Sequence, residues 1–201
     1  MSIDAVTRRQ RGFTLIEALM FIVIIGIALV GILQVINFTT SNSADPLRRK
    51  QALMIAESLM EEIQLAKFTY CDPSSDNAAD AANTAACIVP ERFGQGGGAG
   101  AAAEPVGPRP YDNVNDYVAA ANTSTAAFDV GGVLSDASGT PMAVPGYSVR
   151  LTIVPEALGN IPSGNTASDV GDVLRISIAV SYGGETLVLD GYRTRYAPNS
   201  P

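Results

Sequence analysis

The strongest constraint on this chain is a long apolar run near its N-terminus. The run extends from Phe13 to Ile36, reads FTLIEALMFIVIIGIALVGILQVI and contains a single charged residue. As an α-helix rising about 1.5 Å per residue it would be about 36 Å long, enough for a hydrocarbon core about 30 Å thick. We therefore expect this segment to form a membrane-spanning helix.

Charge is distributed unevenly around the apolar run. The segment before it contains Arg8, Arg9 and Arg11 against one acidic residue, whereas residues 69–201 contain six arginines against fourteen aspartates and glutamates. Basic flanks of a membrane helix tend to stay in the cytoplasm. The acidic remainder of the chain is therefore expected on the outer side of that membrane.

An ordinary secretory signal peptide is the alternative explanation of the apolar run. Such a peptide has an apolar region of only about 7–15 residues followed by a cleavage site of small residues, and Ser41-Asn42-Ser43 could serve as that site. The greater length of the run and the polar stretch Asn37–Asn42 before the site favour a retained helix.

Glu17 is the charged residue within the apolar run. A carboxylate costs at least about 2.5–3.5 kcal/mol near the bilayer centre and less near an interface, so it usually has a partner or a function. Alternatively, its position one turn inside the helix lets the side chain snorkel to the headgroups.

The residues around the start of the run form a recognisable motif. Arg11-Gly12-Phe13-Thr14-Leu15-Ile16-Glu17, with the basic leader before it and the apolar helix after it, closely resembles the cleavage and methylation site of type IV prepilins. The resemblance implies that a prepilin peptidase cuts after Gly12, that Phe13 becomes the N-methylated first residue, and that the helix remains as an anchor. Glu17 matches the acidic position of that motif.

Cleavage after Gly12 would change the chemistry of the N-terminus. It removes the three arginines and creates a cationic amine four residues from Glu17. When such helices gather in a filament, Glu17 of one subunit can pair with the Phe13 amine of its neighbour, and a buried carboxylate without that partner is strongly penalised. We expect this pair to set the register between subunits more than their strength of association.

A second resemblance covers about the first 117 residues. The segments that carry it are Ser43–Ala52, IAESLMEEIQLAKF, Tyr70-Cys71-Asp72-Pro73 and Tyr111–Tyr117, which together look like the D-type minor pilins of the mannose-sensitive haemagglutinin (MSHA) pilus. This resemblance implies a chain in the bacterial inner membrane with a periplasmic C-terminal domain, later transferred to a surface pilus. The implied partners are other pilin subunits, the prepilin peptidase and the inner-membrane assembly machinery, and the implied role includes surface attachment.

A second, amphipathic helix is expected after a break or kink near Thr39–Asp45. Asp45 is a suitable N-cap, and Pro46 is tolerated at the first helical position. Apolar residues recur at helical spacing to Phe68, and we expect this face to pack on a globular domain. Those residues are Leu47, Leu53, Met54, Ala56, Leu59, Met60, Ile63 and Leu65.

The charged residues of this helix include Glu57, Glu61 and Glu62. A di-metal carboxylate site would also need histidines on neighbouring helices, and the chain has none. We therefore expect these glutamates on a solvated or subunit-facing surface.

The only two cysteines, Cys71 and Cys87, are expected to form a disulfide, because the region is exported to an oxidising compartment. The enclosed segment contains several potential oxygen ligands for Ca²⁺, but they lack EF-hand spacing. Those residues are Asp72, Asp76, Asn77 and Asp80. We expect no metal and no cofactor there.

Two further segments precede the C-terminal third. Gly94–Gly100 and the AAAEPVGPRP stretch after it are expected to form a flexible linker without the flanking residues of a phosphate-binding loop. In Tyr111–Tyr117, turn formation is favoured over Ca²⁺ binding. The polar residues of that cluster are Asp112, Asn113, Asn115 and Asp116.

The C-terminal third is expected to form an antiparallel sheet. Apolar and polar residues alternate in Tyr147–Val154 and Val173–Tyr182, Gly183-Gly184 is a hairpin signal, and Glu185–Tyr196 returns as a third strand. A sheet with one apolar face needs a cover, and the amphipathic helix supplies it. The expected fold class is therefore α+β: a long N-terminal helix, with a transmembrane half and an amphipathic half, packed on a C-terminal antiparallel sheet. This is also the arrangement of type IV pilins.

These expectations divide the chain into five parts. They are a leader (1–12), a transmembrane or filament-core helix (13–36), an amphipathic helix (37–68), a disulfide-stapled variable loop region (69–146) and a sheet (147–201).

Composition limits the possible functions. A formal net charge of −7 disfavours nucleic-acid binding, and the absence of His removes the commonest general base and metal ligand. No serine elbow or recognisable carboxylate pair supports an enzyme. We expect a structural minor pilin, with no catalytic residue. The alternatives are a minor pseudopilin of a type II secretion system and a membrane-tethered module that binds a carbohydrate or ion through its Cys71–Val144 loops.

Overall fold

The structure is a computed structural model that describes residues 12–41, 46–96, 104–164 and 170–200. The chain divides into two compact units, Met1–Pro46 and Leu47–Pro201. The first unit contains helix α1, Leu15–Ser41, and the second contains helix α2, Pro46–Leu65, apart from its first residue. Residues 1–11 of the expected leader, the expected N-cap Asp45 and most of the expected break between the helices lie outside the described residues. The five-part division of the chain stays a prediction.

The buried face of α2 differs from the sequence prediction. Pro46 is the first helical residue, as expected, but the helix ends at Leu65 rather than at Phe68. Leu47, Met54 and Leu65, which were expected to pack on the sheet, are 64%, 59% and 79% exposed, and Leu53 is 37% exposed. The residues that are buried instead follow one narrow stripe: Ala52, Ile55, Ala56, Leu59, Met60 and Ile63.

The C-terminal strands form one three-stranded antiparallel sheet in the order β3-β4-β5. Their bounds are Tyr147–Pro155 for β3, Val173–Tyr182 for β4 and Glu185–Thr194 for β5. Burial alternates along each strand, so that Val149, Leu151 and Ile153 of β3 are buried next to Ile176, Ile178 and Val180 of β4. The alternation in the sequence therefore identified the strands and their inner face correctly.

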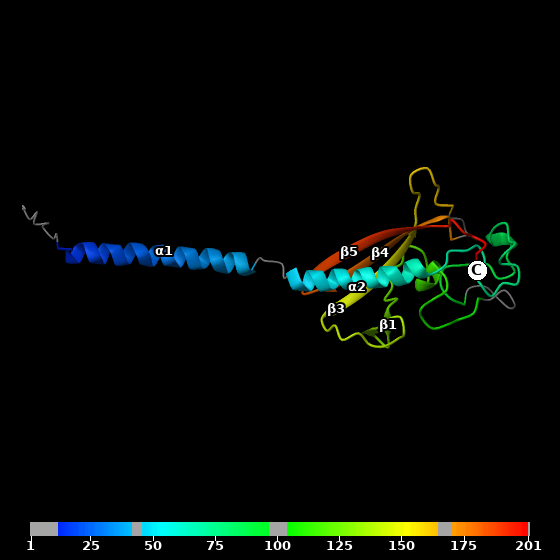
Figure 1. Cartoon of the computed structure of the whole chain (residues 1–201), viewed down its shortest axis with the longest axis horizontal. Helices are drawn as coiled ribbons and strands as arrows, with labels where there is room; N and C mark the ends of the chain where they lie inside the picture. The colour runs from blue at the N-terminus through cyan, green and yellow to red at the C-terminus, as the bar shows by residue number, and fades with distance from the viewer. Residues whose placement is uncertain (1–11, 42–45, 97–103, 165–169, 201) are drawn as a thin grey trace, which may run out of the picture. The chain divides into compact units, whose positions relative to one another are not determined.

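Helix α2 covers the apolar face of this sheet (Figure 1). The approach is close at Gly191 of β5, where an added Cβ would lie 3.0 Å from the sulfur of Met60 and 3.3 Å from Nε2 of Gln64. Gln64 also donates a hydrogen bond to the Tyr192 carbonyl at 3.4 Å. Gly191 thus lets the helix pack directly on the strand backbone.

Among their described residues, the loops between α2 and β3 contain only short regular elements. These are two 3₁₀-helices, η1 (Thr84–Ala86) and η3 (Val114–Tyr117), and a two-stranded ribbon of β1 (Asp129–Val130) and β2 (Val133–Leu134). Tyr117, Val118 and Phe128 from these loops are buried in the same core as α2 and the sheet. The expected α+β fold class, a long N-terminal apolar helix followed by a second helix and antiparallel sheets in a type IV pilin-like arrangement, is confirmed.

Candidate functional site

The N-terminal end of α1 is organised around Thr14. Its Oγ1 accepts a hydrogen bond from the Glu17 backbone N–H at 3.3 Å, and its carbonyl accepts one from the Ala18 N–H at 3.1 Å. Thr14 therefore acts as an N-cap, and Glu17 lies in the first turn, where the positive end of the helix dipole favours an anion. Sequence analysis did not single out Thr14, although a Thr followed three residues later by Glu is a known helix-start signal.

The predicted cleavage point lies just before this cap. Gly12 and Phe13 are outside the helix, Phe13 is 69% exposed, and no heavy atom lies within 4 Å of the position of a Cβ on Gly12. The Gly12–Phe13 peptide bond is therefore accessible and non-helical. Arg8, Arg9 and Arg11 lie outside the described residues. Cleavage at Gly12, methylation at Phe13 and the assembly role of Glu17 stay predictions.

The surface of α1 is apolar and uncovered. Leu15–Phe38 is long and apolar enough to cross a membrane, and its most apolar 18-residue window has a mean hydropathy of 3.0 and contains no buried residue. Ile16, Ile22 and Ile27, for example, are 65%, 69% and 70% exposed. An apolar surface of this length needs lipid or neighbouring helices to cover it.

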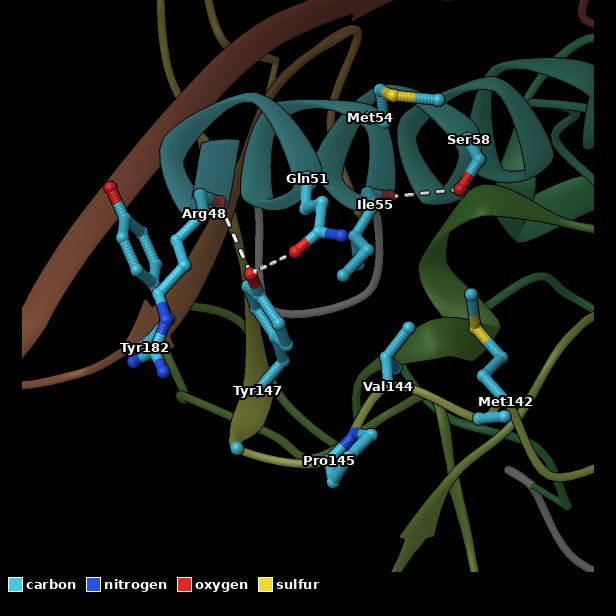
Figure 2. Close-up of a pocket in the computed structure, with 12 residues that line it drawn as sticks. Arg48, Gln51, Met54, Ile55, Ser58, Met142, Val144, Pro145, Tyr147 and Tyr182 are labelled. Atoms are coloured by element: carbon cyan, nitrogen blue, oxygen red, sulfur yellow. Dashed lines mark hydrogen bonds between the residues drawn. The ribbon is translucent and has the colours of Figure 1, made fainter. Parts of the chain in front are cut away.

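In the second unit, an apolar groove runs beside α2 (Figure 2). It has a volume of about 610 Å³ and lies between α2 and the segment that leads into β3. The Tyr147 hydroxyl donates to Oε1 of Gln51 at 2.7 Å and lies 3.3 Å from the Arg48 carbonyl, and the Tyr147 ring stacks on Tyr182 with centroids 5.8 Å apart. The remaining side chains shown include Met54, Ile55, Ser58, Met142, Val144 and Pro145. This lining favours contact with an apolar surface.

Glu62 has a different environment from the one expected. Glu57 and Glu61 are exposed, as expected for a charged face, but the Glu62 side chain is only 8% exposed. It accepts two hydrogen bonds from Arg109 and a third from the Tyr117 hydroxyl at 3.0 Å. Burial, together with the neighbouring Glu62 carboxylate, raises the pKa of the Tyr117 hydroxyl. Arg109 belongs to the segment expected to be a flexible linker, and this pairing anchors that end of the segment.

Cys71 and Cys87 form a disulfide with Cα atoms 5.4 Å apart. Next to it the chain forms a short antiparallel contact, in which the Asp72 N–H donates to the Val89 carbonyl and the Glu91 N–H to the Tyr70 carbonyl, both at 3.1 Å. Asn77 closes the enclosed loop by donating to the Ala86 carbonyl at 2.8 Å. The loop is therefore fixed to the segment that follows α2.

Only some members of the two Asp/Asn clusters, within the Cys71–Cys87 loop and within Tyr111–Tyr117, are buried in the folded chain. Asp76 and Asp80 are exposed, whereas Asp72, Asn113, Asn115 and Asp116 are buried. Asp116 accepts a hydrogen bond from the Asn113 N–H at 3.2 Å, which is the expected turn chemistry. Sequence analysis missed Glu91 and Glu104, which are buried near Asp72, because neither has a neighbouring acidic residue to draw attention to it.

Comparison with known proteins identifies the N-terminal segment. Residues 7–33 match the family model described as the prokaryotic N-terminal methylation motif. No curated protein and no solved structure matches the chain. The motif supports a protein of the type IV pilin or pseudopilin type, which is a structural subunit rather than an enzyme. It also implies processing by a prepilin peptidase, assembly with other pilin subunits and anchoring in a membrane.

Proposed function

We propose that this chain is a minor pilin, a structural subunit of an MSHA-like type IV pilus. In this proposal the prepilin peptidase cuts after Gly12 and the new N-terminus at Phe13 is methylated. Helix α1 holds the chain in the inner membrane, with the second unit in the periplasm. The subunit is then incorporated into the fibre or primes it, and it contributes to pilus assembly and surface attachment.

The observation that carries this proposal is the uncovered apolar surface of α1 directly behind the methylation motif. A helix that buries nothing within its own chain can exchange lipid for the helices of other subunits. Glu17, in the first turn of α1, is the charged group of the helix and would pair with the Phe13 amine of a neighbouring subunit.

The exposed apolar residues of α2 support the same proposal. Leu47, Met54 and Leu65 are exposed rather than packed on the sheet. In a filament these residues would lie where neighbouring subunits can cover them, which would make α2 a second assembly surface. Met54 also lines the groove beside α2.

The experiment compares surface fibres with secretion. Gold-labelled antibodies against the second unit should decorate surface fibres of the wild-type strain, and deletion of the gene should reduce fibre number, and attachment with it, while protein secretion stays normal. Secretion that fails in the deletion strain, with fibres unchanged, would instead assign the chain as a minor pseudopilin of a type II secretion system.

Normal fibre assembly with loss only of attachment would favour the membrane-tethered binding module. The three outcomes are mutually exclusive, so the experiment separates the three functions.

A further inference from the structure

Three buried carboxylates from distant parts of the sequence converge in the second unit. They belong to Asp72, Glu91 and Glu104, which are 2%, 0% and 4% exposed. One oxygen from each lies within 4.8 Å of one oxygen from each of the others. Carboxylates rarely gather out of contact with water unless protons or a cation compensate their charge.

Backbone pairing of irregular segments builds this cluster. The segment after α2 pairs first with residues 112–114, where the Lys67 N–H donates to the Asp112 carbonyl at 2.8 Å and the Val114 N–H to the Lys67 carbonyl at 3.0 Å. It then pairs with residues 89–91 beside the disulfide. The two pairings place Asp72 and Glu91 next to η3, and Glu104 completes the cluster.

The hydrogen bonds around the cluster supply no positive charge. Glu91 accepts from Nδ2 of Asn113 at 2.8 Å and from Nδ2 of Asn115 at 2.6 Å, and Asp72 accepts from the Ser74 N–H at 2.7 Å. All of these donors are neutral. Within the described part of the chain, none of the three carboxylates has an ion-pair partner.

Several oxygens at the cluster have no donor at all. Oε2 of Glu104, Oδ1 of Asn115 and Oδ1 of Asp116 are buried without a hydrogen-bond partner among the described residues. Asn115 is fully buried, and its amide is held against Glu91 by the bond from Nδ2. Leaving such an oxygen unsatisfied costs about 1–3 kcal/mol, so these oxygens need either a proton or a cation.

The electrostatics agree with this shortage. Burial raises the pKa of Glu104 to about 7, although the hydrogen bond that Glu104 shares with Asp116 partly offsets this rise. Burial and the same hydrogen bond raise the pKa of Asp116 to about 10. Burial also raises the pKa of Glu91 well above its usual value. Without a cation, the cluster is therefore costly to ionise near neutral pH.

We propose that Asp72, Glu91 and Glu104 bind one calcium ion, with Oδ1 of Asn115 and the carboxylate of Asp116 as additional oxygen ligands. This proposal departs from the expectation that the chain holds no metal, and the titration below tests the two against each other. It does not depend on the proposed pilin function, because it is built entirely from residues of the second unit.

The donor set and the burial of the site favour calcium, and the spacing admits it. All donors are hard oxygens, which suits Ca²⁺ or Mg²⁺ and not Zn²⁺, whose protein sites use His and Cys. Three oxygens within 4.8 Å of one another share a point no more than about 2.8 Å from each, close to the Ca²⁺–oxygen distance of about 2.3–2.6 Å. Mg²⁺ needs about 2.0–2.1 Å and keeps several waters, for which a buried site leaves little room.

The test uses the full chain purified in detergent and stripped with a chelator, to which CaCl₂ is added. Calorimetric titration should give one site with a Kd of about 1 mM or lower, as in other extracellular calcium modules. Calcium at a hundredfold excess over Kd should raise Tm, followed by circular dichroism, by at least about 5 °C. MgCl₂ at the same concentration should raise it by less than half as much.

Two substitutions make the test specific. Glu104→Gln keeps the shape of the side chain and removes its charge, so the calcium-free variant should melt no lower than wild type while its calcium affinity falls at least tenfold. Asp76→Asn is the control. Asp76 lies in the same disulfide loop as Asp72, but it is exposed and outside the cluster, so this variant should bind calcium like wild type.

The results that overturn the proposal are equally definite. The first is that the wild-type protein neither binds calcium nor shows a higher Tm in up to 10 mM CaCl₂, which is about tenfold above the weakest Kd expected. The second is that the Glu104→Gln variant binds calcium as tightly as wild type does. A stronger response to zinc than to calcium also overturns it. If Glu104→Gln fails to fold, the wild-type titration decides alone.

Discussion

Glu62 and Arg109 form a bidentate ion pair in which Nε of Arg109 donates to Oε1 of Glu62 and Nη2 donates to Oε2, both at 2.8 Å. The two side chains are 8% and 5% exposed, so the pair is almost fully shielded from water. Arg109 also donates to the Ser135 carbonyl at 3.2 Å and lies over the Phe128 ring at 4.9 Å from its centroid. Through Arg109, Glu62 of α2 thereby ties the segment around Arg109 and the segment from Phe128 to Ser135 to the core.

Removal of the Glu62 charge should be strongly destabilising. Glu62→Gln leaves the buried guanidinium without its counter-ion, and breaking a buried pair in this way costs about 3–5 kcal/mol of unfolding free energy. The neighbouring variant Glu61→Gln changes an exposed carboxylate and should alter stability by less than about 0.5 kcal/mol. Denaturant unfolding of both full-length variants in detergent measures the difference, and equal stabilities would contradict the role given to this pair.

The close approach of α2 to β5 predicts a second effect. Gly191→Val places side-chain atoms where Met60 and Gln64 now lie, and such overpacking costs about 1–3 kcal/mol. Gly107 has no heavy atom within 4 Å of its Cβ position and does not have a positive φ, so Gly107→Val serves as the control and should have little effect. Similar melting temperatures for the two variants would show that the helix does not pack on the strand at Gly191.

Which face of α2 is buried could not be read from the sequence. Apolar residues occur almost all round this helix, so Leu53, Met54 and Leu65 fitted a helical pattern as well as Leu59 and Ile63 did. Contact with the sheet selects the stripe with small residues, Ala52 and Ala56, because they allow close approach. The strands were predictable because period-two alternation leaves only one choice of inner face.

The carboxylate cluster was not predictable for another reason. Asp72, Glu91 and Glu104 have no regular spacing, and only the pairing of irregular loops brings them together. The Thr14 cap, in contrast, could have been predicted from the sequence, because its signal is local and lies within four residues.

Stability should depend on pH in a direction set by the buried acids. In the unfolded chain Glu104 and Asp116 lose their protons near pH 4, whereas in the folded chain their pKa values rise to about 7 and about 10. The folded state therefore binds more protons above pH 4, and the stability contributed by these protonated groups is lost as pH rises through 7 and towards 10. Glu91, Asp72 and Asp112 add to the rise for Glu104, whereas Glu104 and Asp112 add to the rise for Asp116.

Thermal melts of the full chain with chelator at pH 5, 7 and 9 measure this dependence. We expect Tm to fall steadily from pH 5 to pH 9, and Glu104→Gln to make the fall shallower below about pH 7, while the contribution of Asp116 remains. A Tm that is flat or rises over this range would contradict the protonation states given to the cluster.

Glu17 should be needed for assembly and not for processing. Glu17→Gln removes the charge that would pair with the Phe13 amine, so the variant should be cut normally and remain in the membrane. Its amount in sheared fibres should fall at least about tenfold, which corresponds to about 1.4 kcal/mol. Glu185→Gln, an exposed residue at the start of β5, is the matched control and should enter fibres like wild type. Equal incorporation of both variants would remove the basis for the Glu17 pair.

The N-terminus of the mature chain tests the account most directly. Intact mass and N-terminal sequencing of the protein recovered from membranes and from sheared fibres should both give a chain that begins at N-methylated Phe13. A chain that begins at Met1, or one cut near Ala44 that has lost α1, would contradict the account.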